Sequence, residues 1–248
     1  MSLSIHAQGP TDDSLRVVGT GAVQGVVEEL APLLAERAGI PLTLTFGTAG
    51  AVRDRIRAGE PADVVIATDV VIQQLVEDGL VDASPRSIVG RVGLGVARRD
   101  DGTASGREAV TPEGFTRMLL EARSIAFADP ASGATAGTYL ASLIERLGIA
   151  PRLRSKLVLG ANGRDVAQRV ARGEAEIGIT FVSEFLPIAG IRVVAMLPES
   201  LQNYTTYAAA IANRSAHKRR AVAVLDHLAG PTTQNARRAA GFSPTPLP

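Results

Sequence analysis

The sequence predicts an α/β protein in which strands alternate with covering helices. Four times, a short apolar run typical of a strand is followed by a turn of small polar residues and then by a helix-like stretch. The second half of the chain repeats this order, and residues 57–66 resemble residues 172–179 as a helix end, a tight turn and a strand. Glycine is common at helix ends in any α/β protein, so this similarity is only supporting evidence for a repeat. The alternation favours parallel sheets covered by helices.

The first half of the chain contains the first set of alternating elements. Strands are expected at 15–18, 42–46 and 64–67, and helices at 23–38, 51–58 and 69–77. Asp69 is expected to cap the last of these helices and Gly79 to stop it, because Asp is a favoured N-cap and Gly a favoured C-terminal stop.

A second set of elements follows an apolar run at 88–96 and a polar stretch at 98–106. Strands are expected at 125–128, 157–159 and 177–181, and helices at 136–147 and 165–171. A terminal helix at 217–229 has an apolar face formed by Ala221, Val224, Leu225 and Leu228. We expect this helix to pack back onto the protein and to stop at Gly230 before a second short helix.

Composition excludes several classes of function. The 248 residues are 46% hydrophobic and 21% charged, as in an ordinary globular protein of one to two domains. A net charge of +1 and only 4% aromatic residues argue against binding of nucleic acid. The absence of cysteine excludes disulfides, thiolate metal sites and cysteine nucleophiles, and three scattered histidines argue against a metal centre. We therefore expect no metal and no cofactor.

Residues 1–13 contain no apolar run of the length that a signal peptide needs, and no uninterrupted apolar span in the chain is long enough to cross a bilayer. This pattern is compatible with a cytosolic start and equally with a signal peptide that has been removed.

The four turns between strand and helix are the main functional signal. They are formed by residues 19–22, 47–50, 129–135 and 160–163. A helix that begins in such a turn presents unpaired backbone N–H groups and the positive end of its dipole, with no bulky side chain to block a ligand. Four such turns predict a receptor for an anion.

Five segments carry a resemblance to a known family, and they lie at residues 15–24, 46–52, 59–69, 174–179 and 225–242. In their order and spacing the chain resembles the periplasmic solute-binding proteins of the molybdate-binding type. The resemblance implies a type II periplasmic binding fold, in which two α/β lobes with mainly parallel sheets are joined by two crossover strands and close on the ligand by a hinge. Lobe I would comprise residues 1–91 and 208–248, and lobe II residues 92–207, with crossovers near 91–96 and 202–208.

Several positions depart from the pattern of the molybdate binders. Ala22 and Ala49 stand where that group places serines, Phe181 matches a tyrosine, and Tyr207 is followed by alanine instead of proline. Each unmet hydrogen bond to a buried ligand costs about 1 to 3 kcal/mol, which disfavours tight molybdate binding unless neighbouring donors compensate. Thr20, Thr48 and the glycine N–H groups could do so in part. Smaller residues also enlarge the pocket, which favours a di- or tricarboxylate and leaves molybdate as the alternative.

The residues expected to contact the ligand lie in the four turns and at the crossovers. They are Thr20, Gly21, Ala22, Thr48, Ala49, Gly50, Arg91, Ser132, Gly133, Ala134, Thr135, Asn162, Gly163, Phe181 and Tyr207. Arg53, Arg91 and Arg164 are candidate carboxylate partners, and Arg91 is favoured because a charge at the start of an apolar crossover strand should face a cleft or a partner. The alternative for each arginine is ordinary exposure. Serine, threonine and asparagine in these turns are also common N-caps, and Asn162 is expected to cap the helix after it.

We expect a periplasmic receptor, its signal peptide removed, that binds a small anion as a monomer and delivers it to a membrane ABC permease. The alternative is an aconitate-isomerase-like enzyme, which shifts a double bond in an unsaturated tricarboxylate by proton transfer. Asp69, Asp129 and Glu184 are the carboxylates nearest the turns, but none is an evident base. Nucleotide binding is disfavoured because the glycine pattern from Gly19 to Gly25 is one residue longer than a dinucleotide fingerprint.

Overall fold

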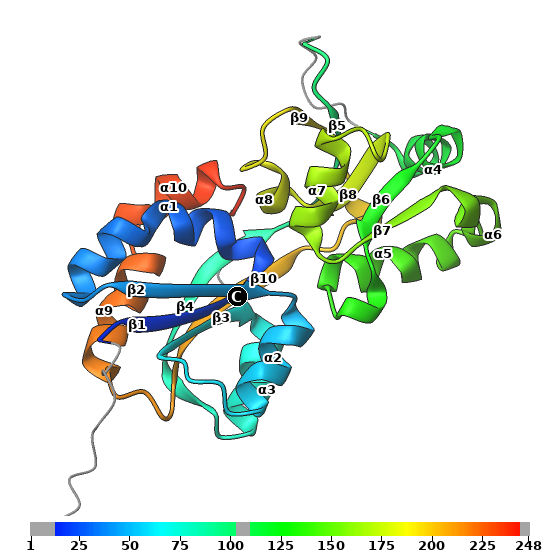
Figure 1. The fold of residues 1–248 in the computed structure, drawn as a ribbon. Helices are drawn as coiled ribbons and strands as arrows, with labels where there is room; N and C mark the ends of the chain where they lie inside the picture. The colour runs from blue at the N-terminus through cyan, green and yellow to red at the C-terminus, as the bar shows by residue number, and fades with distance from the viewer. Residues whose placement is uncertain (1–12, 103–109, 244–248) are drawn as a thin grey trace, which may run out of the picture.

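The computed structural model describes residues 13–102 and 110–243, which form two lobes (Figure 1). Each lobe is a five-stranded sheet with helices on both faces. The leader before Asp13 and the later part of the polar stretch at 98–106 lie outside the described residues. Within the described residues, no helix combines the length and the apolar character needed to span a bilayer.

The sheet of the first lobe has the strand order β2-β1-β3-β10-β4. Its strands are β1 (Leu15–Thr20), β2 (Leu42–Gly47), β3 (Val64–Thr68), β4 (Val81–Val92) and β10 (Thr205–Ala212). Four of these strands run in the same direction, and β10, which returns from the second lobe, runs antiparallel to both of its neighbours.

The sheet of the second lobe repeats this plan with the order β7-β6-β8-β5-β9. Its strands are β5 (Leu94–Arg99), β6 (Ile125–Ala128), β7 (Leu157–Gly160), β8 (Ile177–Phe181) and β9 (Ile191–Met196). Here β5, which enters from the first lobe, is the strand that runs against the other four. The chain passes between the two sheets at Gly93 and again between residues 197 and 204.

Alternating side chains on the strands decide which helices cover which face of each sheet. In the first lobe, Val64 and Ile66 pack under α1 (Gly21–Ala38) and α9 (Lys218–Ala229), and α10 (Gln234–Ala239) lies against α1. Val65 and Ala67 face the opposite way, under α2 (Ala49–Arg57) and α3 (Asp69–Glu77).

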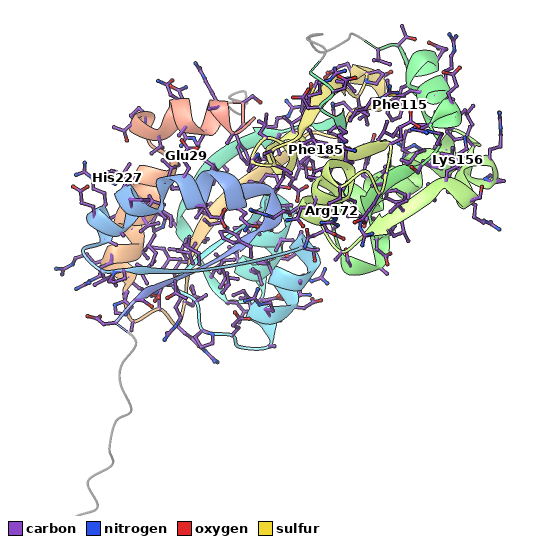
Figure 2. All side chains as sticks on the ribbon, turned by 45° about the horizontal axis from the view of Figure 1, so that its top comes forward. Glu29, Phe115, Lys156, Arg172, Phe185 and His227 are labelled. Atoms are coloured by element: carbon purple, nitrogen blue, oxygen red, sulfur yellow. The ribbon has the colours of Figure 1, made fainter. Side chains whose placement is uncertain are left out.

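The second lobe is covered in the same manner. Phe115 and other apolar side chains of α4 (Pro112–Glu121), α5 (Thr135–Arg146) and α6 (Ala150–Leu153) pack on one face. Phe185 of α8 (Val182–Phe185) and the apolar side of α7 (Gly163–Ala171) pack on the other (Figure 2). Short 3₁₀ turns complete the fold at Pro130–Ser132, Arg154–Lys156, Glu199–Leu201 and Pro231–Thr233.

Three aromatic rings connect the lobes. Tyr207 of β10 makes edge-to-face contacts with Phe181 of β8 and with Phe242, at ring-centroid distances of 6.0 Å in both cases. All three residues belong to one apolar cluster that continues from the first lobe into the second. The carboxyl ends of the strands in both sheets therefore meet beside a packed aromatic junction.

One local expectation from the sequence is wrong. Asp69 does not cap α3, because the cap is Thr68, whose hydroxyl accepts a hydrogen bond from the Val71 N–H at 3.3 Å, and Asp69 is the first helical residue. The apolar run at 88–96, within which the first crossover was expected, is divided between two strands. It breaks at Gly93, where a Cβ atom would lie 2.9 Å from the ring of Tyr204, so that β4 ends in one lobe and β5 begins in the other.

The helices after the four turns begin one or two residues earlier than the sequence pattern predicts. They start at Gly21, Ala49, Thr135 and Gly163, because the small residues of the turns form the first helical turn itself. Both α4 and β9 were absent from the expected elements. A capping threonine at 111 and Pro112 in the first helical position mark the start of α4.

Candidate ligand-binding cavity between the lobes

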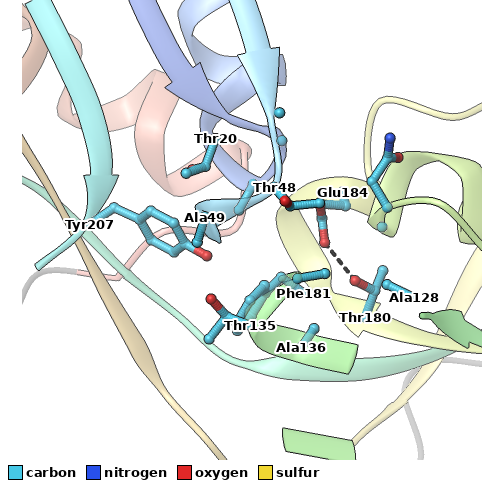
Figure 3. A pocket seen from close by; sticks show the side chains of 16 residues that line it. Thr20, Thr48, Ala49, Ala128, Thr135, Ala136, Thr180, Phe181, Glu184 and Tyr207 are labelled. Carbon is cyan, nitrogen blue, oxygen red and sulfur yellow. Dashed lines mark hydrogen bonds between the residues drawn. The ribbon is translucent and has the colours of Figure 1, made fainter. Parts of the chain in front are cut away.

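A cavity lies between the two lobes, where the N-termini of α1, α2, α5 and α7 meet (Figure 3). The cavity has a volume of about 30 Å³. Eleven of the fifteen residues expected to contact a ligand line it, namely Thr20, Gly21, Ala22, Thr48, Ala49, Ala134, Thr135, Asn162, Gly163, Phe181 and Tyr207. Each of the four turns contributes to the wall. Parallel strands end at the same edge of their sheet, so the turns that follow them lie close together.

Gly50, Gly133 and Ser132 lie beside the cavity, where the lobes touch directly. The Gly50 N–H donates a hydrogen bond to the Gly133 carbonyl at 3.1 Å, and the Thr48 hydroxyl donates to the Ser132 carbonyl at 2.6 Å. The hydroxyl of Ser132 is turned back to its own loop, where it donates to the carbonyl of Asp129 at 2.7 Å. These residues join the lobes through backbone groups.

Arg91 lies away from the residues that line the cavity. Its guanidinium carbon lies 4.0 Å from the ring centroid of Tyr204, and its backbone pairs with Ser243 in both directions, at 2.9 and 2.8 Å. The side chain is held by an aromatic face and the backbone by the C-terminal segment, so that neither points at the cavity. Arg53 borders a neighbouring groove, and Arg164 forms an ion pair with Glu28 at 3.6 Å.

Two of the four helix N-termini have backbone N–H groups that no side chain caps. The hydroxyl of Thr20 at the start of α1 makes no capping bond, and Ala134 at the start of α5 has no polar side chain. Thr48 and Asn162 do cap α2 and α7. The first turns of α1, α2 and α5 contain no acidic residue, so the positive ends of their dipoles are not neutralised from within the helix.

The Thr20 hydroxyl has no hydrogen-bond partner among the described residues, although the residue is only 3% exposed and lines the cavity. A buried hydroxyl without a partner is disfavoured by about 1 to 3 kcal/mol, so that natural proteins rarely leave one. The hydroxyl lies at the uncapped start of α1, and helix N-termini of this kind are common anion-binding sites in proteins.

Glu184 lines the cavity and was not among the expected ligand contacts. It lies in the single turn of α8, is 9% exposed, and accepts a hydrogen bond from the Thr180 hydroxyl. Its carboxyl group lies directly against Gly163, where a Cβ atom would overlap it, and one carboxyl oxygen lies 3.1 Å from the position of a Cβ on Gly21. The carboxyl group therefore sits between the first residues of α1 and α7.

Burial raises the pKa of Glu184 to about 7, although hydrogen bonds from the Thr180 hydroxyl and the backbone of Phe181 lower it in part. Burial also raises the pKa of Tyr207 well above its usual value, and the nearby charge of Glu184 adds to this effect. Near neutral pH, Glu184 can thus either hold or release a proton, while the phenol of Tyr207 keeps its own. The cavity contains an acid–base group beside donors for an anion.

The sequence contained a signal for Thr180 and Glu184. Both flank the end of β8, and this strand was expected to run parallel to β6 and β7, whose following turns were chosen as ligand contacts. The segment after β8 should therefore reach the same edge of the sheet. No glycine-containing turn marks this place, because α8 begins at Val182 directly after β8 ends at Phe181.

Comparison with known proteins places the chain in a family. Residues 15–243 match the model of the bacterial extracellular solute-binding proteins. The chain is 29% identical to an aconitate isomerase of Pseudomonas sp. over 94% of its length and 88% of the relative's. It is 25% identical to the molybdate-binding protein ModA of Escherichia coli K12 over 98% of its length and 94% of the relative's.

The fold has solved counterparts as well. The periplasmic molybdate-binding protein of Azotobacter vinelandii superposes with a TM-score of 0.75 over 95% of this chain and 100% of its own, at 22% identity. The two-lobed fold and the family match cover the same part of the chain. The chain belongs to the bacterial extracellular solute-binding protein family.

Proposed function

We propose that this protein is an extracytoplasmic receptor that closes its two lobes on a small organic anion with carboxylate groups and delivers it to a membrane ABC permease. The observation that carries the proposal is the convergence of four helix N-termini on one cavity, with the buried Thr20 hydroxyl unpartnered at one of them. Uncapped N–H groups and a hydroxyl without a partner can donate hydrogen bonds to an anion.

The wall of the cavity favours a carboxylate over molybdate. Ala22, Ala49 and Phe181 offer no hydroxyl, so a compact tetrahedral oxyanion would find few side-chain donors. A carboxylate group has two oxygens, so it needs fewer donors than a tetrahedral oxyanion. Two of the relatives described above are named for molybdate, so oxyanions are the direct competitors in the experiment.

A thermal-shift panel tests the proposal with citrate, cis-aconitate, trans-aconitate, molybdate, tungstate, sulfate and phosphate. A ligand at about 100 times its dissociation constant stabilises the folded state by about 2.7 kcal/mol, which raises the melting temperature visibly. We expect a shift with one or more of the carboxylates. A shift with molybdate or tungstate alone would contradict the proposal that the ligand is a carboxylate. No shift with any anion would contradict the proposal that the protein is an anion receptor.

Thr20→Val is expected to weaken binding of the anion about tenfold or more while leaving the free energy of unfolding unchanged or slightly higher. The hydroxyl has no partner in the unliganded protein, so replacing it with a methyl group of similar size loses no hydrogen bond in that state. In the complex, the same change removes the hydrogen bond from Thr20 to the anion. Titration calorimetry and chemical unfolding measure the two effects. Thr116→Val on α4, which loses an internal hydrogen bond to Pro112, is the control and should keep full affinity.

A second candidate function is an isomerase of the aconitate type. It is favoured by one observation, the carboxyl group of Glu184 on the cavity wall with a pKa of about 7, which suits a group that removes a proton from carbon and returns it elsewhere. The 29% identity to an aconitate isomerase agrees with this candidate. Proton NMR of cis- and trans-aconitate in D₂O with the purified protein distinguishes the two functions. The enzyme gives interconversion with deuterium uptake, and the receptor gives binding with no product.

A further inference from the structure

Glu184 places a carboxyl group inside the site that the helix N-termini build for an anion. The carboxyl lies against Gly163 and close to Gly21, the first residues of α7 and α1, and it lines the same cavity as the Thr20 hydroxyl. An anion that accepts hydrogen bonds from these groups therefore comes to rest beside Glu184. An ionised Glu184 and an anion in contact with it would repel each other strongly in a buried site.

No cationic side chain offsets this repulsion, because none of the described residues that line the cavity is a lysine, arginine or histidine. On the two helices packed against α8, Glu29, Glu36 and Arg37 of α1 are exposed to solvent, and other charged side chains form ion pairs. Glu28 of α1 pairs with Arg164 of α7 at 3.6 Å, and Asp165 of α7 pairs with Arg169 at 3.0 Å. Neither arginine is a counter-ion to Glu184.

The strands packed against α8 contribute no counter-ion either. Arg192 of β9 pairs with Asp101 at 3.5 Å, and Arg98 and Arg99 of β5 are exposed at the end of the strand away from α8. From β10, only Tyr207 faces the carboxyl group, and its pKa lies well above the usual value, so it is neutral. The carboxyl group must therefore be neutral itself for an anion to lie next to it.

We propose that the cavity binds its anion together with one proton, which Glu184 carries. The inference rests on the proposed function and deepens it. The protonated carboxyl group becomes a donor to a carboxylate oxygen of the ligand, with the proton taken from solvent and no bond to carbon formed or broken. The Thr180 hydroxyl, which donates to the other side of the group, holds it in place. A pKa of about 7 makes the proton available near neutral pH.

The experiment is titration calorimetry of trans-aconitate between pH 6 and 9, in pairs of buffers with different ionisation enthalpies. The two charges already present raise the last ionisation of this tricarboxylate to about pH 6, so the pH dependence is taken from the points above pH 7, where the probe keeps its charge. Above pH 7 the free protein has lost the proton that the complex needs. The dissociation constant is therefore expected to rise about tenfold for each pH unit, with uptake of close to one proton per anion bound.

Glu184→Gln separates the proton from the shape of the side chain. The neutral amide should bind trans-aconitate with one affinity across the range, more tightly than the wild type at pH 9, and without proton uptake. Glu28→Gln on α1 is the matched control, and it should keep the pH dependence of the wild type. Binding without proton uptake and with constant affinity in the wild type overturns this inference and leaves the receptor intact. No binding of any anion of the panel at any pH overturns both.

Discussion

Gly163→Ala is expected to weaken anion binding by more than a hundredfold and to lower the free energy of unfolding by about 2 to 3 kcal/mol. A Cβ atom at this position overlaps the carboxyl group of Glu184, so the first turn of α7 or the glutamate must move. Overpacking of a filled site is disfavoured by about 1 to 3 kcal/mol. Either movement alters the cavity, because both residues line it. Chemical unfolding and titration calorimetry measure the two losses.

A change at Glu184, the residue that the added Cβ would overlap, supplies the control. In the double variant Gly163→Ala with Glu184→Ala, the overlapping group is gone, so most of the lost stability should return, and the coupling between the two changes is measurable as a double-mutant cycle. Gly47→Ala is a further control for the stability measurement alone, since its Cβ would meet no atom closer than 3.5 Å but Gly47 itself lines the cavity. Equal losses in the single and the double variant would contradict the packing of Glu184 on Gly163.

Gly50→Ala is expected to weaken anion binding by about tenfold to a hundredfold without loss of stability. Gly50 is the second residue of α2, where alanine suits a helix better than glycine by up to about 1 kcal/mol. Its Cβ would nevertheless lie 3.1 Å from the Cα of Gly133 in the other lobe, at the point where the Gly50 N–H reaches the Gly133 carbonyl. In the proposed hinge closure, Gly50 and Gly133 touch only when the two lobes are closed. The added Cβ atom therefore disfavours the closed form and shifts the population towards an open form.

Small-angle X-ray scattering and calorimetry test the shift together. The variant should show a larger radius of gyration than the wild type without ligand, and it should need more ligand to reach the closed value. Gly114→Ala in the first turn of α4 is the matched control, because the contacts of its Cβ are confined to Val110 and Thr111 of its own lobe. Unchanged scattering and unchanged affinity in Gly50→Ala would show that this contact does not limit closure.

Much of the architecture follows from local pattern. Short apolar runs, separated by small polar turns, predicted the strands at Leu15–Thr20, Val64–Thr68 and Ile177–Phe181 to within two residues at either end. The four turns were visible because glycine and threonine in a strand-to-helix turn are distinctive in any sequence. The order of the elements then favoured parallel sheets, whose strands end at one edge.

The errors arise where a residue depends on contacts distant in the sequence. Arg91 resembles a charge placed to meet a ligand, yet the ring of Tyr204 more than a hundred positions later takes up its guanidinium. Glu184 resembles an ordinary polar residue in a short helix, and it becomes a cavity group because Gly163 and Gly21 leave room for its carboxyl. Neither outcome is encoded in the neighbours of these residues along the chain.

By itself, therefore, the sequence determined the α/β alternation and the small-residue turns that start four helices, because hydrophobic periodicity and backbone preference act over a few residues at a time. The tertiary structure alone decided which of those turns share a wall with Glu184, where Arg91 is held, and where Gly50 meets Gly133. Burial, the resulting pKa of a carboxyl group and contact between lobes depend on the packing of distant segments, which no local pattern contains.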